Sequence, residues 1–215
     1  MKNYLAIDTS GSYLTVLTVK DGEAFWEFLP DCAMSHSVNL MNAVDKTLEK
    51  AGLTLEECHF FAAVVGAGSF TGIRIGISAV KGFCLATGKP SLAVTSFDVA
   101  AYNGVDGKGK RLCLVDALHG AYYACGYEGT DVVLPPAYLT EDEVFALYEQ
   151  GYTLWSATEL SPVKGAPVFA VSPVEGLKKA VDSLSQKLDP FGELTALYVR
   201  KSSAEINRES GEGKA

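Results

Sequence analysis

The N-terminal half of the chain changes from an alternating hydrophobic pattern to a helical one. Residues 4–9 are a short apolar run, and residues 14–20 and 23–29 alternate on either side of an Asp-Gly turn. This arrangement is typical of a strand followed by a β-hairpin. In residues 37–51 apolar positions then recur at helical spacing until a glycine, which predicts an amphipathic helix.

A further strand and helix pattern follows directly. A buried strand is predicted at residues 60–65, and a glycine-rich turn joins it to a long apolar helix over residues 71–86. A glycine and a proline end that helix. A strand at residues 91–95 and a short helix at residues 97–102 complete this half.

The pattern restarts after residues 103–110, a polar stretch with three glycines that we interpret as a linker. The remaining elements are predicted as strands at residues 111–116, 121–127, 131–134, 152–156 and 168–171, and as helices at residues 141–148 and 174–187. Each half therefore begins with strands and continues as helix, strand and helix. An aspartate closes the first strand of each half, Asp8 and Asp116.

Duplicated βββαβα halves are the construction of the actin-like and sugar-kinase (ASKHA) superfold. The order of elements therefore predicts an α/β protein of this superfold, with an N-terminal subdomain at residues 1–102 and a C-terminal subdomain at residues 103–208. The small and charged residues 209–215 are expected to form a disordered tail. A shared superfold by itself predicts no activity.

The charge and the lack of export signals narrow the classes of function. The chain carries 26 acidic and 18 basic residues, a formal net charge of -8, so its average field repels phosphate backbones and anionic lipids. No apolar stretch approaches the roughly 20 residues that a membrane span needs, and no signal peptide is visible. We therefore expect a cytoplasmic protein with no membrane contact. Its five cysteines contain no CxxC pair and are expected to be reduced thiols.

The turn at residues 66–72 is the most informative local motif. A buried strand, a glycine-rich turn and a helix start together point free backbone N–H groups at an anion. The turn is not a Walker loop, because Ile73 and Arg74 occupy the positions that require Lys and Ser or Thr. It is not a nucleophile elbow either, because Ala67 stands where the first glycine of GxSxG is needed.

Glycines inside the following helix also need an explanation, since each lowers helix stability by about 1 kcal/mol relative to alanine. Gly72, Gly76 and Ala79 share one face at spacings of four and three. We expect this smooth face to admit another helix backbone, either the helix at residues 37–51 or one from a partner chain. The alternative is that both helices only pack on their own sheet.

Motifs distributed along nearly the whole chain resemble the TsaB (YeaZ) family. They are AIDTS near the start, HS before the first helix, GxGSFTGxRIGxxxxKG, VTS at residues 94–96, VDA at 115–117 and YVRK at 198–201. Ala67 departs from the family pattern, which usually has proline there. The resemblance implies a non-catalytic subunit of the bacterial machinery that makes threonylcarbamoyladenosine beside the anticodon of tRNA.

The resemblance also implies the partners. The helices at residues 37–51 and 71–86 would pack against the matching pair of TsaD, the catalytic relative, in a four-helix contact, with the ATPase TsaE and tRNA joining the complex. ATP and metal are expected on the partner subunits, and a homodimer is expected when the protein is alone. The predicted interface residues are His36, Met41, Val44, Leu48, Gly72, Arg74, Gly76 and Ala79.

A metal site of its own is not expected. In TsaD a similar glycine-rich turn, helix and strand are followed by HxxxH, whose two imidazoles bind a metal. The equivalent positions here hold Ser96 and Ala100, and neither side chain can serve as an imidazole ligand. Because this chain lacks the HxxxH ligands of its glycoprotease-like relative, we expect no metallopeptidase activity.

The alternative function is a Mg-ATP-dependent small-molecule kinase of the same superfold. Asp8 and Asp116 stand where such kinases place acidic groups near Mg²⁺ and phosphate. Thr9 and Ser10 imitate a first phosphate loop, so Asp8, Thr9, Ser10 and Asp116 are candidates for a weak phosphate contact. The structural alternative is that Asp8 caps a hairpin turn and Asp116 orders a loop.

Overall fold

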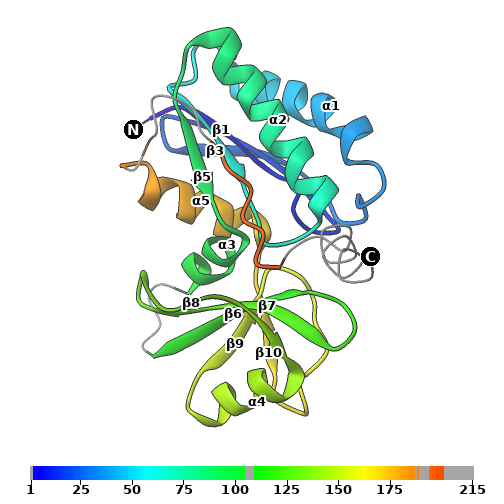
Figure 1. Cartoon of the computed structure of the whole chain (residues 1–215). Coiled ribbons are helices and arrows are strands. Elements are labelled where there is room, and N and C mark those ends of the chain that lie inside the picture. The colour runs from blue at the N-terminus through cyan, green and yellow to red at the C-terminus, as the bar shows by residue number, and fades with distance from the viewer. Residues whose placement is uncertain (1, 105–108, 187, 189–193, 201–215) are drawn as a thin grey trace, which may run out of the picture.

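The computed structural model describes residues 2–104, 109–186, 188 and 194–200, and the predicted tail at 209–215 lies outside them. In Figure 1 two five-stranded sheets lie one above the other. The first sheet has the strand order β3-β2-β1-β4-β5. Its strands are β1 (Tyr4–Asp8), β2 (Leu14–Lys20), β3 (Glu23–Leu29), β4 (Phe60–Val64) and β5 (Ser91–Val94).

The second sheet repeats this topology. Its strands are β6 (Lys110–Asp116), β7 (Ala121–Glu128), β8 (Asp131–Thr140), β9 (Thr153–Ser156) and β10 (Val168–Ala170), in the order β10-β9-β6-β7-β8. In both sheets the first three strands are antiparallel and the fourth and fifth join in parallel. The duplicated actin-like fold predicted from the sequence is confirmed. The second half differs in that residues 157–167 join β9 to β10 without a helix.

Helices cover both sheets, and two of them lie between the sheets. On one side of the first sheet, α1 (His36–Ala51) and α2 (Phe70–Thr87) pack against a core of their own. On the other side α3 (Ser96–Asn103) and α5 (Pro173–Leu184) lie between the sheets, and α4 (Glu141–Glu149) covers the far side of the second sheet (Figure 1). The five helices agree with the predicted ones, although α5 ends earlier than expected.

The halves exchange their last helices. α5, which follows the second sheet, packs on the first through Leu177, Ala180 and Val181. Its neighbour α3 comes from the first half, and the two helices are in close contact, since a Cβ added to Gly176 would lie 2.0 Å from the Val99 carbonyl oxygen. This exchange ties the two sheets into one structure.

The prediction for β8 was too short. We expected a strand at residues 131–134. The strand instead continues to Thr140, through Pro135 and Pro136. It does so because β8 is at the edge of its sheet and its pairing with β7 shifts register at the two prolines, between the pairs Gly126–Leu134 and Ala124–Ala137. All five cysteines are free thiols, as expected.

Gly72 and Gly76 on the smooth face of α2 do not admit another helix, and this part of the prediction was wrong. Gly72 and Gly76 are buried against the end of β1. A Cβ added to Gly72 would lie 2.0 Å from the Thr9 carbonyl oxygen, and one added to Gly76 would lie 2.6 Å from Thr9 Oγ1. The Thr9 hydroxyl also donates to the Gly72 carbonyl at 2.7 Å. The two glycines therefore let α2 approach its own sheet.

Alanine substitutions at two glycines of α2 test this packing. Gly72→Ala should lower the free energy of unfolding by about 1–3 kcal/mol, because the new methyl group collides with the Thr9 backbone. Gly82→Ala is the matched control. No atom lies within 4 Å of its Cβ position, so this substitution should raise stability by about 1 kcal/mol. Urea denaturation measures both. Equal effects of the two substitutions would contradict the close contact.

Candidate functional site

The outward side of α1 and α2 carries large apolar side chains in water. Met34, Val38 and Leu85 are 98%, 78% and 88% exposed, and Met41 and Phe70 are 47% and 39% exposed. We call this surface, defined by these five residues, the outer face. Single exposed apolar residues are common, whereas Met41 and Phe70 line one hollow between the two helices, which makes this surface a candidate for an interaction site. The outer face is thus the first candidate site.

A groove of about 550 Å³ runs between the two helices on the outer face. Its floor and walls are apolar or small, and its lining residues are Ser37, Leu40, Met41, Phe70, Thr71, Arg74, Ile75, Ser78 and Ala79. Short side chains along α2 leave room for the side chains of another helix. The groove therefore supplies shape as well as apolar area.

The structure separates the predicted interface residues into two groups. Met41 and Arg74 are exposed, and Ala79 lies partly buried in the groove. The other predicted residues are buried within the first half itself, and they are His36, Val44, Leu48, Gly72 and Gly76. The α1 residues are buried because the apolar side of this helix packs against the first sheet.

His36 illustrates this correction. It is 2% exposed, and its Nε2 atom lies 2.9 Å from the Tyr13 carbonyl oxygen. Sequence reasoning missed Val38 and Leu85, which lie outside the buried stripes. Their signal was an apolar residue at a position where the helical pattern calls for a polar one.

Arg74 is held at the edge of the groove by two aromatic rings. Its guanidinium carbon is 3.7 Å from the centre of the Phe70 ring, and its Nε donates to the Tyr198 hydroxyl at 3.0 Å. Phe70 and Tyr198 are stacked with centroids 4.9 Å apart. The segment 194–200 is itself attached to the first sheet, since the Leu197 N–H donates to the Val65 carbonyl at 2.7 Å. The segment 194–200 thus contributes to this surface.

The second candidate site is the cleft between the two sheets, about 540 Å³ in volume. Ser10 and Asp116, two of the predicted phosphate contacts, line it from opposite sides. The Asp116 carboxylate is exposed, and its Oδ1 accepts a hydrogen bond from the Leu118 N–H at 2.7 Å. This bond is the loop-ordering role that was the structural alternative for Asp116.

Asp8 has no atom available to the cleft. It is 0% exposed, and its Oδ1 accepts hydrogen bonds from the Ser10 N–H at 2.8 Å and the Ser10 hydroxyl at 2.6 Å. Its Oδ2 accepts from the Tyr13 hydroxyl at 2.8 Å. Burial raises the pKa of the Asp8 carboxyl, and the hydrogen bonds from Ser10 and Tyr13 and the nearby His36 lower it in part. The carboxylate orders its own turn.

The rest of the phosphate-like loop is packed against the glycine-rich turn. A Cβ added to Gly68 would lie 2.2 Å from the Ser10 carbonyl oxygen, which also accepts from the Ser69 N–H at 2.7 Å. Thr9 is 0% exposed beneath α2. The glycine-rich turn therefore lies against Ser10, and the side chains of Asp8 and Thr9 are buried away from the cleft.

The positions that correspond to the HxxxH of the catalytic relative are structural in this chain. Ser96 is 4% exposed and its hydroxyl lies within hydrogen-bond distance of the Ala67 carbonyl and of Ser10 Oγ, at 2.5 and 3.0 Å. Ala100 is 1% exposed in the core. Within the described residues no group of three or more His, Cys, Asp or Glu side chains is arranged to hold a metal. No helix of the described part is long and apolar enough to cross a membrane.

Comparisons with known proteins agree on one family. The family model described as TsaD, tRNA N6-adenosine threonylcarbamoyltransferase, matches residues 28–151. The chain is 30% identical over 124 residues to the tRNA threonylcarbamoyladenosine biosynthesis protein TsaB of Bacillus subtilis (strain 168), which is 58% of this chain and 54% of that protein. It is 30% identical over 151 residues to the TsaB protein of Escherichia coli (strain K12), which is 64% of each chain. The matches thus span less than two thirds of these relatives.

A solved structure has the same fold. YeaZ from Pseudomonas aeruginosa superimposes with a TM-score of 0.73 at 23% identity, over 92% of this chain and 100% of that chain. At this identity the likeness concerns the fold alone. It agrees with the duplicated topology described above.

The buried Asp8 generates a prediction about pH. Because the native carboxyl binds its proton more tightly than the unfolded one, its ionisation lowers the free energy of unfolding as the pH rises above about 4. In Asp8→Asn the amide oxygen can accept from Ser10 and the amide nitrogen can donate to the Tyr13 oxygen. Asp8→Asn should therefore be at least as stable as the parent protein at pH 7, and this advantage should shrink toward pH 4.

Urea denaturation between pH 4 and pH 8 measures this difference. Asp116→Asn, which removes the same charge from an exposed position, is the control and should change stability by less than about 0.5 kcal/mol at any pH. Clear destabilisation by Asp8→Asn at pH 7 would show that the native state requires the charged carboxylate.

Proposed function

Because the chain belongs to the TsaD family and, within it, to the TsaB (YeaZ) branch, we propose that it is a non-catalytic subunit in threonylcarbamoyladenosine biosynthesis on tRNA. Its role is to bind TsaD, the catalytic member of the family, and hold it in an active form. The observation that carries the proposal is the outer face, whose exposed residues Met41 and Phe70 line the groove between two neighbouring helices.

The outer face suits a helical partner. Val38 and Met41 on α1 and Leu85 on α2 present apolar area, while the small residues of α2 let a helix backbone come close. A matching pair of helices from TsaD would complete a four-helix contact. Arg74, which lies over the Phe70 ring and donates a hydrogen bond to the Tyr198 hydroxyl, is then placed to pair with a carboxylate of the partner at the rim of the contact.

The interior of the cleft supports a binding role over a catalytic one. The kinase alternative needs Asp8 to reach a nucleotide-bound cation, yet Asp8 is 0% exposed and both of its oxygens accept hydrogen bonds from the protein. Ser96 and Ala100 offer no imidazole at the metal-binding positions of TsaD. ATP and metal are therefore assigned to the partner subunits, with TsaE as the ATPase.

The net charge of the protein supports the assignment of tRNA binding to the other subunits. A chain with a formal net charge of -8 repels the phosphate backbone, so tRNA would be gripped by the other subunits. When the protein is alone, its exposed apolar surface favours a homodimer through the outer face. The homodimer and the complex with TsaD then compete for one surface.

Met41→Glu tests the surface. The side chain is 47% exposed on α1, so a charge there leaves the core intact but enters the proposed contact. It should weaken binding to the cognate TsaD by at least about tenfold and shift the free protein toward monomer. Size-exclusion chromatography with light scattering measures both. Val132→Glu, which adds the same charge at a 53% exposed position on β8, is the matched control and should bind normally.

The function itself is tested by reconstitution. Threonylcarbamoyladenosine formation on tRNA is measured with TsaD, TsaE, ATP and threonylcarbamoyl-adenylate, with and without this protein. Formation that requires the protein, survives Asp8→Asn and falls with Met41→Glu is the expected result. Formation that is independent of the protein, with no complex, would contradict the proposal.

A further inference from the structure

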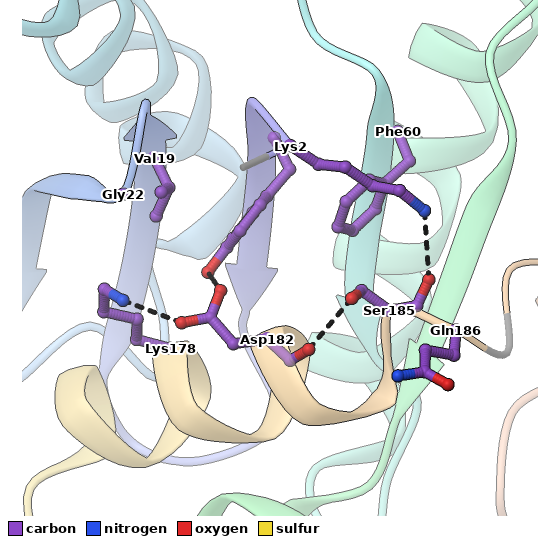
Figure 2. Close-up of a pocket in the computed structure, with 9 residues that line it drawn as sticks. Lys2, Val19, Gly22, Phe60, Lys178, Asp182, Ser185 and Gln186 are labelled. Atoms are coloured by element: carbon purple, nitrogen blue, oxygen red, sulfur yellow. Dashed lines mark hydrogen bonds and ion pairs between the residues drawn. The ribbon is translucent and has the colours of Figure 1, made fainter.

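The part of the chain that follows the second sheet returns to the first sheet in two places. The first is the last turn of α5, where Asp182 Oδ1 accepts a hydrogen bond from the Tyr4 hydroxyl at 2.8 Å (Figure 2). The Ser185 carbonyl accepts another from the Lys2 ammonium at 3.3 Å. Both contacts lie at the beginning of β1. The second place is at the other end of the sheet, where the segment 194–200 meets the residue after β4.

The segment 194–200 is fixed against the glycine-rich turn that leads into α2. Leu194 is 3% exposed and belongs to the core that α1 and α2 cover. The backbone approaches the turn closely, since a Cβ added to Gly66 would lie 2.5 Å from the Leu197 carbonyl oxygen. Tyr198 therefore begins from a fixed backbone, although its side chain is 42% exposed.

Tyr198 restricts the Arg74 side chain together with Phe70. The Arg74 Nε donates to the Tyr198 hydroxyl at 3.0 Å, and the guanidinium carbon lies 3.7 Å from the centre of the Phe70 ring. The two rings are themselves stacked. An exposed arginine normally samples several rotamers and loses conformational entropy when a partner fixes it. Here these contacts restrict the side chain before a partner arrives.

The charge of Arg74 is oriented but not neutralised. The two groups that hold it, a phenyl ring and a phenol, are uncharged. None of the ion pairs formed within the described part of the chain involves Arg74, although the chain has 26 acidic residues. A guanidinium binds a carboxylate through two parallel N–H···O bonds, and this geometry depends on its orientation. An oriented guanidinium at the edge of the groove therefore suits a carboxylate on a docking partner.

We propose that Tyr198 is a positioning residue of the TsaD contact, which holds Arg74 in the orientation that pairs with a carboxylate of TsaD. The proposal rests on the proposed function and deepens it, because it adds a residue of the segment 194–200 to a contact otherwise built from α1 and α2. Tyr198 acts through its hydroxyl and through Arg74. Its effect on binding therefore depends on the presence of Arg74.

A double-mutant cycle of Tyr198→Phe and Arg74→Ala tests this dependence, with binding of the full chain to the cognate TsaD measured by isothermal titration calorimetry. Tyr198→Phe keeps the ring and removes the hydrogen bond, so it should weaken binding by about three- to tenfold. Arg74→Ala should weaken it by at least about tenfold. Once Arg74 is replaced by alanine, adding Tyr198→Phe should change binding by less than about twofold.

Tyr138→Phe is the matched control. It removes a hydroxyl from a tyrosine of similar exposure, 37% against 42%, on β8 of the second sheet, and it should bind TsaD as the parent does. Thermal unfolding verifies that each variant folds. Equal weakening by Tyr198→Phe with and without Arg74 would show that Tyr198 only supports the fold of its segment. That result would overturn the proposal, as would unchanged binding of either Tyr198→Phe or Arg74→Ala.

Met41→Glu distinguishes this failure from failure of the proposed function. If the parent binds TsaD and Met41→Glu does not, while Tyr198→Phe binds as the parent does, the outer face is the contact and the positioning role is wrong. If the parent itself does not bind TsaD, the proposed function is contradicted and the role of Tyr198 with it.

Discussion

The close contact between β1 and the start of α2 is the constraint on which the N-terminal half depends. Thr9 touches the helix backbone directly, because Gly72 and Gly76 have no side chain to keep it away. This contact fixes how α2 is rotated about its axis. Ile73 and Ile77 are therefore buried in the core, and Arg74 and Leu85 face water. The side of α2 that belongs to the outer face is exposed because the glycine side of the helix packs on Thr9.

The same contact explains why the cleft is poorly suited to nucleotide chemistry. The glycine-rich turn packs on the Ser10 carbonyl, and Asp8 and Thr9 are buried behind it, away from the cleft. The Asp8 carboxylate, at the position of an acidic catalytic group in this superfold, accepts its described side-chain hydrogen bonds from Ser10 and Tyr13. The loop after β1, which resembles a phosphate loop in sequence, here stabilises the N-terminal half. The outer face of α1 and α2 remains exposed to solvent.

The two halves are joined more closely than a tandem repeat requires. α5 leaves the second sheet and completes the core of the first, and the segment 194–200 then runs along Val65 to place Tyr198 on Arg74 and Phe70. Tyr198, which follows both sheets in the sequence, thus lies beside the outer face, in contact with Phe70 and Arg74.

The sequence by itself determined the elements, the duplication and the family, because hydrophobic periodicity and the GSFTGIRIG motif are local properties of the chain. It also showed that the two positions of the HxxxH motif hold Ser96 and Ala100, which cannot serve as imidazole ligands. Only the tertiary structure decided which face of α2 is buried, because Gly72 fits equally well against a partner or against Thr9 until the sheet is in place. The tertiary structure also decided the extent of β8, whose prolines are tolerated at the edge of the sheet. It likewise brings Lys2 to Ser185 at the end of α5, across nearly the whole length of the chain. Contacts between distant segments have no signature in local spacing, and these contacts place the surfaces on which function depends.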